Sequence, residues 1–540
     1  MNLSSAGSMP EMAISRILLN CDLHTFIPGQ PQAEALALQG GIIAAAGSRT
    51  DVLNLADAST IIDDLEGKTV LPAFCDAHIH LLEYGFSLLR VDCETATRAE
   101  CLQRLRHQLT RTAPGAWVLG HGWNHNIWPE GIGSRQLLDE ICPNNPVYLT
   151  HKSLHSAWAN SAALKAAGIF EDSPDPQGGQ FARDEKGRLT GILLESAMRV
   201  VEAAVPQPDQ AAREQAILTA QKSLLEFGIT SVHDFDPWEC YMALAALEEK
   251  GELKLRVMKG IPLPNLDQTI AAGIRSGQGS DHLSFGWLKL FADGALGPQT
   301  AAMLNPYEGS DSIGMLFLES ADIVEFGRKT LPAGISMAVH AIGDRANREV
   351  IDGYAQLNQM GLVAKNQLPL RIEHVQLLDP RDVRRLAQFR ITASMQPIHA
   401  PSDRQMADRH WGLRCAHAYA WKTIKDSGAN LIFGSDAPVE SPNPYWGLQA
   451  ALSRKLAGAG PDIPSWYPQL CLPLKEALRA YITEPQACAG KADRLGKLAK
   501  DYLADLVVFS TDFFKVDAEE ISRIKPDAVM SDGSWVVKRF

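Results

Sequence analysis

Long hydrophobic runs are missing from this 540-residue sequence: no stretch of 18 consecutive apolar residues occurs, so we expect no membrane-spanning helix. Residues 1–11 contain no Lys or Arg and no long apolar core, which argues against a secretory signal. Low-complexity segments and fixed-period repeats are also absent, which argues against a solenoid. We therefore expect a cytoplasmic protein.

Paired cysteines are missing as well. The nine cysteines are odd in number and scattered, and no two of them form a C-x-x-C pair. This pattern favours neither a disulfide framework nor a zinc ribbon. We expect reduced and mostly buried thiols.

Positive charge is in deficit. The 51 Lys and Arg residues face 63 Asp and Glu residues, which gives a net charge of −12 with neutral histidines. An acidic balance without a basic stripe argues against nucleic acid and against an anionic membrane surface as partners. A small neutral or cationic substrate fits this balance better, and a homodimer is the default expectation for the assembly.

The composition is that of a globular protein, with 46% apolar and 21% charged residues. At both ends of the chain, short apolar runs alternate with turn residues, which is typical of strands and hairpins. Such runs occur between Ala13 and Thr69 and again between Ala504 and Val537. We predict that residues 1–69 and 489–540 pair into one β-sandwich.

Between these ends, apolar strand-like runs alternate with helical patterns over residues 70–488. Eight such repeats predict an α/β protein with a parallel (β/α)8 TIM barrel, whose chemistry lies at the carboxyl ends of the strands. The eight expected strands are 70–77, 230–233, 255–259, 287–291, 336–339, 370–373, 391–396 and 431–435.

The interval between the first two expected barrel strands, Leu81 to Ile229, is far too long for one loop. It predicts a large insertion after the first barrel strand, at about residues 92–228, lying at the mouth of the barrel. Strands are expected in it at 117–119 and at 147–149.

Two histidines close the first barrel strand. Residues two apart in a strand face the same side, so His78 and His80 can bind one metal ion together. Later strands also end in polar groups that metals bind: Lys289, His340, His374 and Asp436. Nitrogen and oxygen ligands of this kind suit zinc, with iron, manganese, cobalt or nickel as alternatives.

These residues lie in motifs that resemble the amidohydrolase superfamily of metal-dependent hydrolases. Within it, the long insertion and several motifs are similar to the branch that contains N-substituted formamide deformylase. The motifs are residues 71–80 (LPAFCDAHIH), 289–297 (KLFADGALG), 339–346 (VHAIGDRA), 371–376 (RIEHVQ) and 433–439 (FGSDAPV), with SAWANSAAL at 156–164 and PQGG at 176–179.

The resemblance implies a role for each residue of the set. His78 and His80 would bind the more buried metal, His340 and His374 the second, and Asp436 would be both ligand and proton shuttle. Lys289 would bridge the metals after its amine adds carbon dioxide and becomes a carbamate, which an apolar strand favours by lowering the lysine pKa. The alternative for Lys289 is an ordinary lysine paired with an acidic residue in a one-metal site.

Other residues are candidates for substrate contacts: Trp123, His155, Asp293 and Arg345. His155 lies in a family-like stretch, but Ser153-Leu154 stands where the family usually has Asp-Gly, which indicates a more apolar pocket. Asp293 and Arg345 follow ligand strands and would shape loops. Glu373 alternates to the face opposite His374, so a salt bridge under a helix is expected for it.

The resemblance implies a metal-dependent hydrolase that cleaves a C–N bond of an amide-like small molecule by attack of metal-bound hydroxide. Two alternatives stay open. One is a deaminase of an aminated ring with a single metal and no carbamate. The other is a catalytically inactive barrel that acts as a binding or regulatory scaffold.

Overall fold

The computed structural model describes residues 13–152, 155–363, 368–460 and 462–540. It divides into two compact units. One comprises Met1–Tyr84 and Ile217–Phe540, and the other comprises Gly85–Ala216. Helices α2 (Leu81–Leu89) and α7 (Gln210–Glu226) contain the points at which the chain passes from one unit to the other.

The larger unit contains the predicted parallel barrel. Its eight-stranded sheet runs in the order β21-β20-β19-β18-β17-β16-β15-β8, and every neighbouring pair is parallel. The strands are β8 (Phe74–Ile79), β15 (Ile229–Asp234), β16 (Arg256–Pro262), β17 (Leu283–Phe291), β18 (Met337–Ala341), β19 (Arg371–His374), β20 (Thr392–Met395) and β21 (Asn430–Phe433).

Hydrogen bonds just beyond the first and last strands nearly close the barrel. The Asp436 amide donates to the His78 carbonyl at 2.7 Å, and the His80 amide donates to the Ala437 carbonyl at 2.9 Å. Because these bonds join the carboxyl ends of β8 and β21, the residues that follow the two strands are held side by side.

Each barrel strand is followed by at least one helix, as a (β/α)8 fold requires. The amphipathic α11 (Asp344–Gln359) shows why these segments fold as helices against the sheet: its buried face includes Val350, Ile351 and Tyr354, while Glu349 and Asp352 are partly exposed. The helices of the barrel after α7 are α8 (Trp238–Glu249), α9 (Leu266–Ala271), α10 (Ser320–Thr330), α11 (Asp344–Gln359), α12 (Val383–Gln388), α13 (His399–Trp411), α14 (Trp421–Asp426), α15 (Pro444–Ser453) and α16 (Leu474–Cys488).

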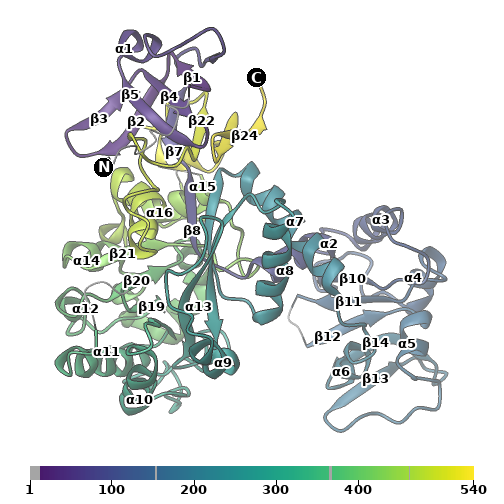
Figure 1. Cartoon of the computed structure of the whole chain (residues 1–540). Helices are drawn as coiled ribbons and strands as arrows, with labels where there is room; N and C mark the ends of the chain where they lie inside the picture. Colours follow the sequence, from purple (N-terminus) through teal and green to yellow (C-terminus); the bar gives the residue numbers. More distant parts are fainter. Residues whose placement is uncertain (1–12, 153–154, 364–367, 461) are drawn as a thin grey trace, which may run out of the picture. The chain divides into compact units, whose positions relative to one another are not determined.

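The N- and C-terminal strands of the larger unit form the predicted β-sandwich, as the purple and yellow strands of Figure 1 show. One sheet has the order β5-β4-β1-β6 and the other β24-β23-β22-β7-β2-β3, and they share a core in which Leu18 and Leu38 pack with Val508 and Met530. The strands are β1 (Arg16–Leu19), β2 (Asp22–Ile27), β3 (Gln30–Ala33), β4 (Ala35–Gln39), β5 (Ile42–Gly47), β6 (Ile61–Asp64), β7 (Thr69–Pro72), β22 (Leu506–Phe509), β23 (Ala528–Ser531) and β24 (Ser534–Lys538). Short helices α1 (Arg49–Leu53) and α17 (Ala518–Ile521) accompany them.

The run expected as one barrel strand at 70–77 is divided between the two parts of this unit. β7 pairs with β2 and β22 in the sandwich, and β8 begins the barrel at Phe74. Between them, the Ala73 amide donates to the Asp505 carbonyl. Both strands are buried along their whole length, so hydrophobicity alone does not show the division.

The smaller unit is built on a six-stranded sheet of order β13-β14-β12-β11-β10-β9. The strands expected at 117–119 and 147–149 are its β10 (Val118–Trp123) and β11 (Val147–His151), which are parallel neighbours. Trp123, Trp128 and Trp158 share one of its hydrophobic clusters. Its other elements are β9 (Val91–Asp92), β12 (Ser156–Ala159), β13 (Gly179–Arg183), β14 (Leu189–Glu195), α3 (Arg98–Leu109), α4 (Arg135–Ile141), α5 (Ser161–Ala166) and α6 (Ala197–Glu202).

The nine cysteines are free thiols, and all except the half-buried Cys471 are buried, as expected from their spacing. In the described part of the chain, no helix combines the length and apolarity that crossing a membrane requires.

Candidate active site

The barrel brings the six predicted metal-binding residues to one cavity. This cavity, about 330 Å³ in volume, lies at the carboxyl ends of the barrel strands. His78 lies on β8, and His80 directly follows this strand. Strands β17, β18 and β19 supply one side chain each, and the loop after β21 supplies the carboxylate of Asp436. The six residues that line it are His78, His80, Lys289, His340, His374 and Asp436.

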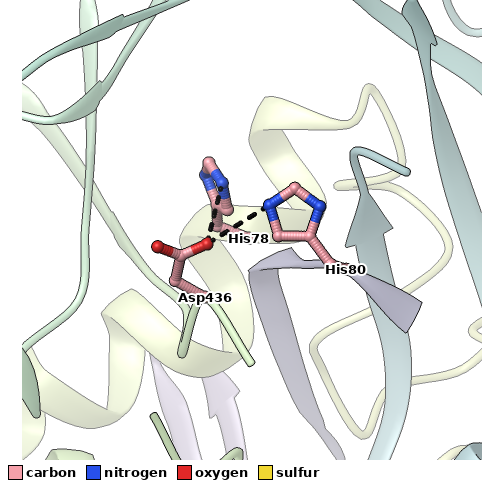
Figure 2. A group of neighbouring side chains, drawn as sticks. All are labelled: His78, His80 and Asp436. Carbon is pink, nitrogen blue, oxygen red and sulfur yellow. Dashed lines mark ion pairs between the residues drawn. The ribbon is translucent and has the colours of Figure 1, made fainter. Parts of the chain in front are cut away.

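His78, His80 and Asp436 lie close together in the site, as shown in Figure 2. Asp436 Oδ1 lies 3.5 Å from His78 Nε2 and 3.4 Å from His80 Nε2. Two ligands of a tetrahedral zinc ion are separated by about 3.3 Å when each bond is about 2.0 Å. The three side chains are therefore spaced as ligands of one small cation would be.

Three of the histidines are oriented through Nδ1 by a side-chain oxygen. When that oxygen accepts the Nδ1 proton, Nε2 keeps its lone pair and can bind a metal. The pairs are His78 with Glu373 Oε2 at 2.6 Å, His80 with Asp236 Oδ1 at 3.1 Å, and His374 with Gln396 Oε1 at 2.9 Å.

Electrostatics favour neutral rings at three positions. Burial lowers the pKa of both His78 and His340 to about 4, with a further contribution from the Lys289 charge. Burial also holds the pKa of His374 well below its usual value. A metal requires the neutral imidazole, so these three rings are in the form that can bind one at neutral pH.

His80 and Asp436 form a charged pair, in which a metal would have to displace the Nε2 proton of His80. Burial would lower the pKa of His80, but hydrogen bonds and charges from Asp236 and Asp436 outweigh it and raise the pKa to about 10. Burial likewise opposes ionisation of Asp436, yet the hydrogen bond from His80 and the charges of nearby histidines hold its pKa well below the usual range. The carboxylate is thus available as an anionic group.

Lys289 is 6% exposed and lies on β17 with its amine against aromatic rings. Its Nζ is 4.7 Å from the centre of the Phe235 ring and 5.1 Å from that of Phe291. Within the described residues it makes no ion pair with a carboxylate. Burial is the main cause that lowers its pKa to about 8, so an appreciable share of the amine is uncharged at neutral pH.

Glu373 lies inside the barrel rather than under a helix. Its side chain is fully buried and accepts hydrogen bonds from Arg371, from Nε at 2.8 Å and Nη2 at 3.0 Å, while it also contacts His78 Nδ1. The expected salt bridge exists, but its partner is two residues away on the same strand. The expectation from strand alternation is wrong for Glu373 because β19 ends at the next residue, His374, whose positive φ of 76° breaks the alternation.

The backbone is also unusual around Asp436. This residue has φ of 61°, in the left-handed region that non-glycine residues seldom occupy. Nearby, a Cβ on Gly434 would lie 2.4 Å from the His78 amide nitrogen and 2.7 Å from Asp76 Oδ1. Only glycine fits this approach of β21 to β8, which places Asp436 beside the two histidines.

The four predicted substrate contacts stay predictions, and their surroundings differ. Trp123 is 1% exposed in the core of the smaller unit, where its indole donates to the Leu149 carbonyl. His155 is exposed on that unit and pairs with Glu195 at 3.2 Å. The neighbouring Ser153-Leu154, from which an apolar pocket was inferred, lie outside the described residues.

The other two candidates follow barrel strands. Asp293 is 1% exposed and accepts hydrogen bonds from the Ala302, Ile342 and Gly343 amides, so it shapes the loop beside His340. Burial raises its pKa to about 7. Arg345 is half-buried at the start of α11 and is not among the described residues that line the cavity.

Sequence reasoning missed several side chains of this cavity. His399, Gln376, Asp403 and Glu440 line it, and Asp236 orients His80. Asp236 and His399 each follow a barrel strand, β15 and β20, from which no site residue had been assigned. The rule that barrel strands deliver functional groups at their carboxyl ends would have found both.

A barrel whose strand ends gather neutral imidazoles, a buried lysine and a carboxylate around one cavity has the framework of a barrel hydrolase. Comparison with known proteins agrees: residues 62–537 match the model of the Amidohydrolase family. The chain belongs to this family and is a hydrolase.

Individual relatives carry different names. The chain is 28% identical over 517 residues to N-substituted formamide deformylase of Arthrobacter pascens, covering 92% of this chain and 93% of that protein. It is 31% identical over 395 residues to the exoenzymes regulatory protein AepA of Pectobacterium carotovorum subsp. carotovorum, covering 70% and 83%. A crystal structure of an uncharacterized metal-dependent hydrolase from Pyrococcus furiosus is similar with a TM-score of 0.75 and 27% identity, covering 93% of this chain and all of that one.

Proposed function

We propose that this protein is a metal-dependent hydrolase that cleaves the C–N bond of an amide-like small molecule, an N-substituted formamide or a related amide. The observation that carries the proposal is the convergence of His78, His80, Lys289, His340, His374 and Asp436 on one cavity. The similarity to N-substituted formamide deformylase makes formamides the first substrates to test.

The donor set fits a divalent metal, and we propose zinc. His78 Nε2 is buried and has no hydrogen-bond partner among the described residues, while its Nδ1 is held by Glu373. A polar atom left in this state indicates a missing ligand. His78, His80 and Asp436 would hold one ion.

A second ion would be held by His340 and His374. Lys289 lies on β17, next to the strand that carries His340, and its lowered pKa suits addition of carbon dioxide to the neutral amine. We propose that the resulting carbamate helps to hold both ions. Ions held by these residues would supply hydroxide at neutral pH by lowering the pKa of water, and they would polarise a carbonyl group.

Asp436 would transfer the proton. Its carboxylate can accept a proton from the attacking water and pass it to the leaving nitrogen, which is a poor leaving group unless it is protonated. Its contacts with His78 and His80 hold the carboxylate on the cavity floor. The remaining walls are largely apolar, with Phe291, Leu296 and Ile342 beside Lys289 and His340, which suits an organic substituent on the amide nitrogen.

The proposal is tested by the substitution Asp436→Asn together with a hydrolysis screen of formamides, acyl amides, carbamates and ring amines in zinc-loaded protein. The variant should keep most of the metal, because the histidines remain, and should lose about 10²–10⁴-fold in kcat, as expected for loss of a general acid-base group. An unchanged rate in the variant would rule out the shuttle.

Metal content separates the proposal from its alternatives. About two equivalents per chain agree with the bridged site, and about one agrees with a ring deaminase. A regulatory scaffold, the kind of role in the name of the Pectobacterium relative, needs no metal and no turnover. Elemental analysis of protein purified without chelator measures this number directly.

A further inference from the structure

His399 lies in the cavity beside the proposed ligands, although nothing above gives it a role. It is the first residue of α13, is 6% exposed, and lines the cavity. One of its ring nitrogens lies within 4.8 Å of a ring nitrogen of His374 and of a carboxylate oxygen of Asp436. Its Nε2 is buried with no hydrogen-bond partner among the described residues.

His399 is held through Nδ1, as His78, His80 and His374 are, but by a different kind of atom. The amide nitrogen of Gln376 lies 3.4 Å from His399 Nδ1, whereas His374 Nδ1 faces the amide oxygen of Gln396. An amide nitrogen donates, so Nδ1 of His399 is the acceptor and its proton is on Nε2. His374 thus presents a lone pair to the cavity, and His399 presents an N–H.

From this contrast we propose that His399 is a catalytic residue that binds the substrate rather than a metal. Its Nε2–H donates a hydrogen bond to the carbonyl oxygen of the amide that is cleaved. The bond strengthens as negative charge develops on that oxygen during attack, and a preorganised donor of this kind mainly raises kcat. The inference rests on the proposed function, since it assumes a substrate with a carbonyl group.

The donor set of the cavity agrees with this assignment. An amide carbonyl oxygen is an acceptor and needs a donor. Asp403 and Glu440, which also line the cavity, are carboxylates that can only accept when ionised and so cannot donate to this oxygen. Asp403, one turn after His399 on α13, already accepts a hydrogen bond from the Tyr419 hydroxyl. His399 is therefore the side chain on this wall that is suited to hold a carbonyl oxygen.

The test uses methylphosphonate, a tetrahedral anion, as a probe that needs no turnover. Its dissociation constant is measured by calorimetry on zinc-loaded wild type, His399→Phe, His399→Gln and the control His410→Phe. His410 is on the same helix at its opposite end. Metal content and kcat on the best amide of the screen are measured for the same proteins.

We expect His399→Phe to keep its metal, to bind methylphosphonate at least tenfold more weakly and to lose about 10²-fold in kcat, the effect of removing one such donor. His399→Gln, which keeps an N–H, should lose less, and His410→Phe should behave as wild type.

Three results would overturn the inference: methylphosphonate bound equally by wild type and His399→Phe, no binding by zinc-loaded wild type, or loss of metal from His399→Phe, which would make His399 a ligand. The proposed function fails separately, if wild type hydrolyses no amide. Weaker methylphosphonate binding by His399→Phe would then still support the contact at Nε2.

Discussion

In each imidazole of the cavity, one ring nitrogen contacts a protein group. This contact determines whether the other ring nitrogen can bind a metal or donate a hydrogen bond. For His78, His80 and His374 the fixed atom is Nδ1. His340 is the exception, because its Nε2 lies 2.9 Å from the Gly294 carbonyl oxygen. Groups outside the proposed ligand set therefore orient the proposed ligands, and losing such a partner typically weakens metal binding 10- to 100-fold.

Lys289 provides a prediction at this scale. Lys289→Met should lose metal and activity together, because methionine fills the apolar site but cannot form a carbamate. Acetate supplied with bicarbonate-free zinc buffer should restore part of both, since it offers two oxygens in the space left by the lysine amine. Elemental analysis and a rate assay measure the two effects.

The matched variant is Lys289→Glu, which carries its own carboxylate and should retain more metal than Lys289→Met does. If Lys289→Met kept two equivalents of metal and its full rate, the lysine would be an ordinary buried amine and the bridge would be wrong.

The site residues that end or follow strands could be predicted from the sequence, but Glu373, which orients one of them, could not. His78, His80, His340, His374 and Asp436 each end or follow an apolar run, and the barrel rule places them together. The sequence pattern around Glu373 does not reveal its role, because that role depends on the distance from its carboxylate to His78, 295 residues earlier in the chain. Only a folded structure contains that distance.

At the scale of elements, β21 approaches β8 closely beside the site. Gly434 permits it, because any Cβ there would meet the His78 backbone. Gly434→Ala should therefore push β21 away from β8, cost about 1–3 kcal/mol of stability as overpacking does, and weaken metal binding by displacing His78.

Thermal unfolding and zinc titration of Gly434→Ala measure the two effects. Gly47→Ala in β5 is the control, because the nearest atom to its added Cβ is a Val52 methyl at 4.0 Å. Wild-type zinc affinity in Gly434→Ala would show that β21 can move without affecting His78.

All eight barrel strands could be located from apolar runs, but not all of their ends: β17 begins at Leu283, four residues before the expected strand, and β8 begins at Phe74 rather than Val70. The run from Val70 to Ala77 is continuous in hydrophobicity, and the division between β7 and β8 appears only in their pairing partners. The partner of β7 is β22, more than 400 residues away. Local sequence holds no information about such a partner.

At the scale of the larger unit, one buried ion pair joins the barrel to the sandwich. Asp505, just before β22, accepts hydrogen bonds of 2.8 Å from Nε and Nη2 of Arg256 on β16, and both side chains are at most 5% exposed. Burial raises the pKa of Asp505, but the Arg256 charge and hydrogen bonds outweigh it and hold the pKa below its usual value.

The sign of the pH dependence follows. Because the folded pKa is below the unfolded value of about 3.9, the pair stabilises the fold fully above that value and progressively less as the pH falls through the folded pKa. Asp505→Asn should lower the unfolding temperature near neutral pH, since breaking a buried pair costs about 3–5 kcal/mol. Its difference from wild type should shrink as the pH falls below about 4.

Thermal unfolding across this pH range tests the pair. Asp512→Asn is the control, because its partner Lys515 is a solvent-exposed neighbour on the surface, and such pairs contribute little. A difference between Asp505→Asn and wild type that stayed constant down to pH 3 would contradict the assignment.

The overall architecture could be predicted because each part has its own pattern: short runs with turns at the ends, strand and helix alternation in the middle, and an interval too long for a loop. The path of the chain in the smaller unit could not. Its sheet mixes parallel and antiparallel pairs, and neither hydrophobic period nor spacing distinguishes these in short buried strands.

The pairing of β7 with β22 also bears on when the enzyme can first work. During synthesis, β7 and the adjoining strand that carries His78 emerge from the ribosome more than 400 residues before β22 does. The sandwich sheet that adjoins the strand carrying His78 is therefore incomplete until β22 has been synthesised. A nascent chain should therefore bind a metal at the proposed site only after β22 has emerged, however early its histidines are made.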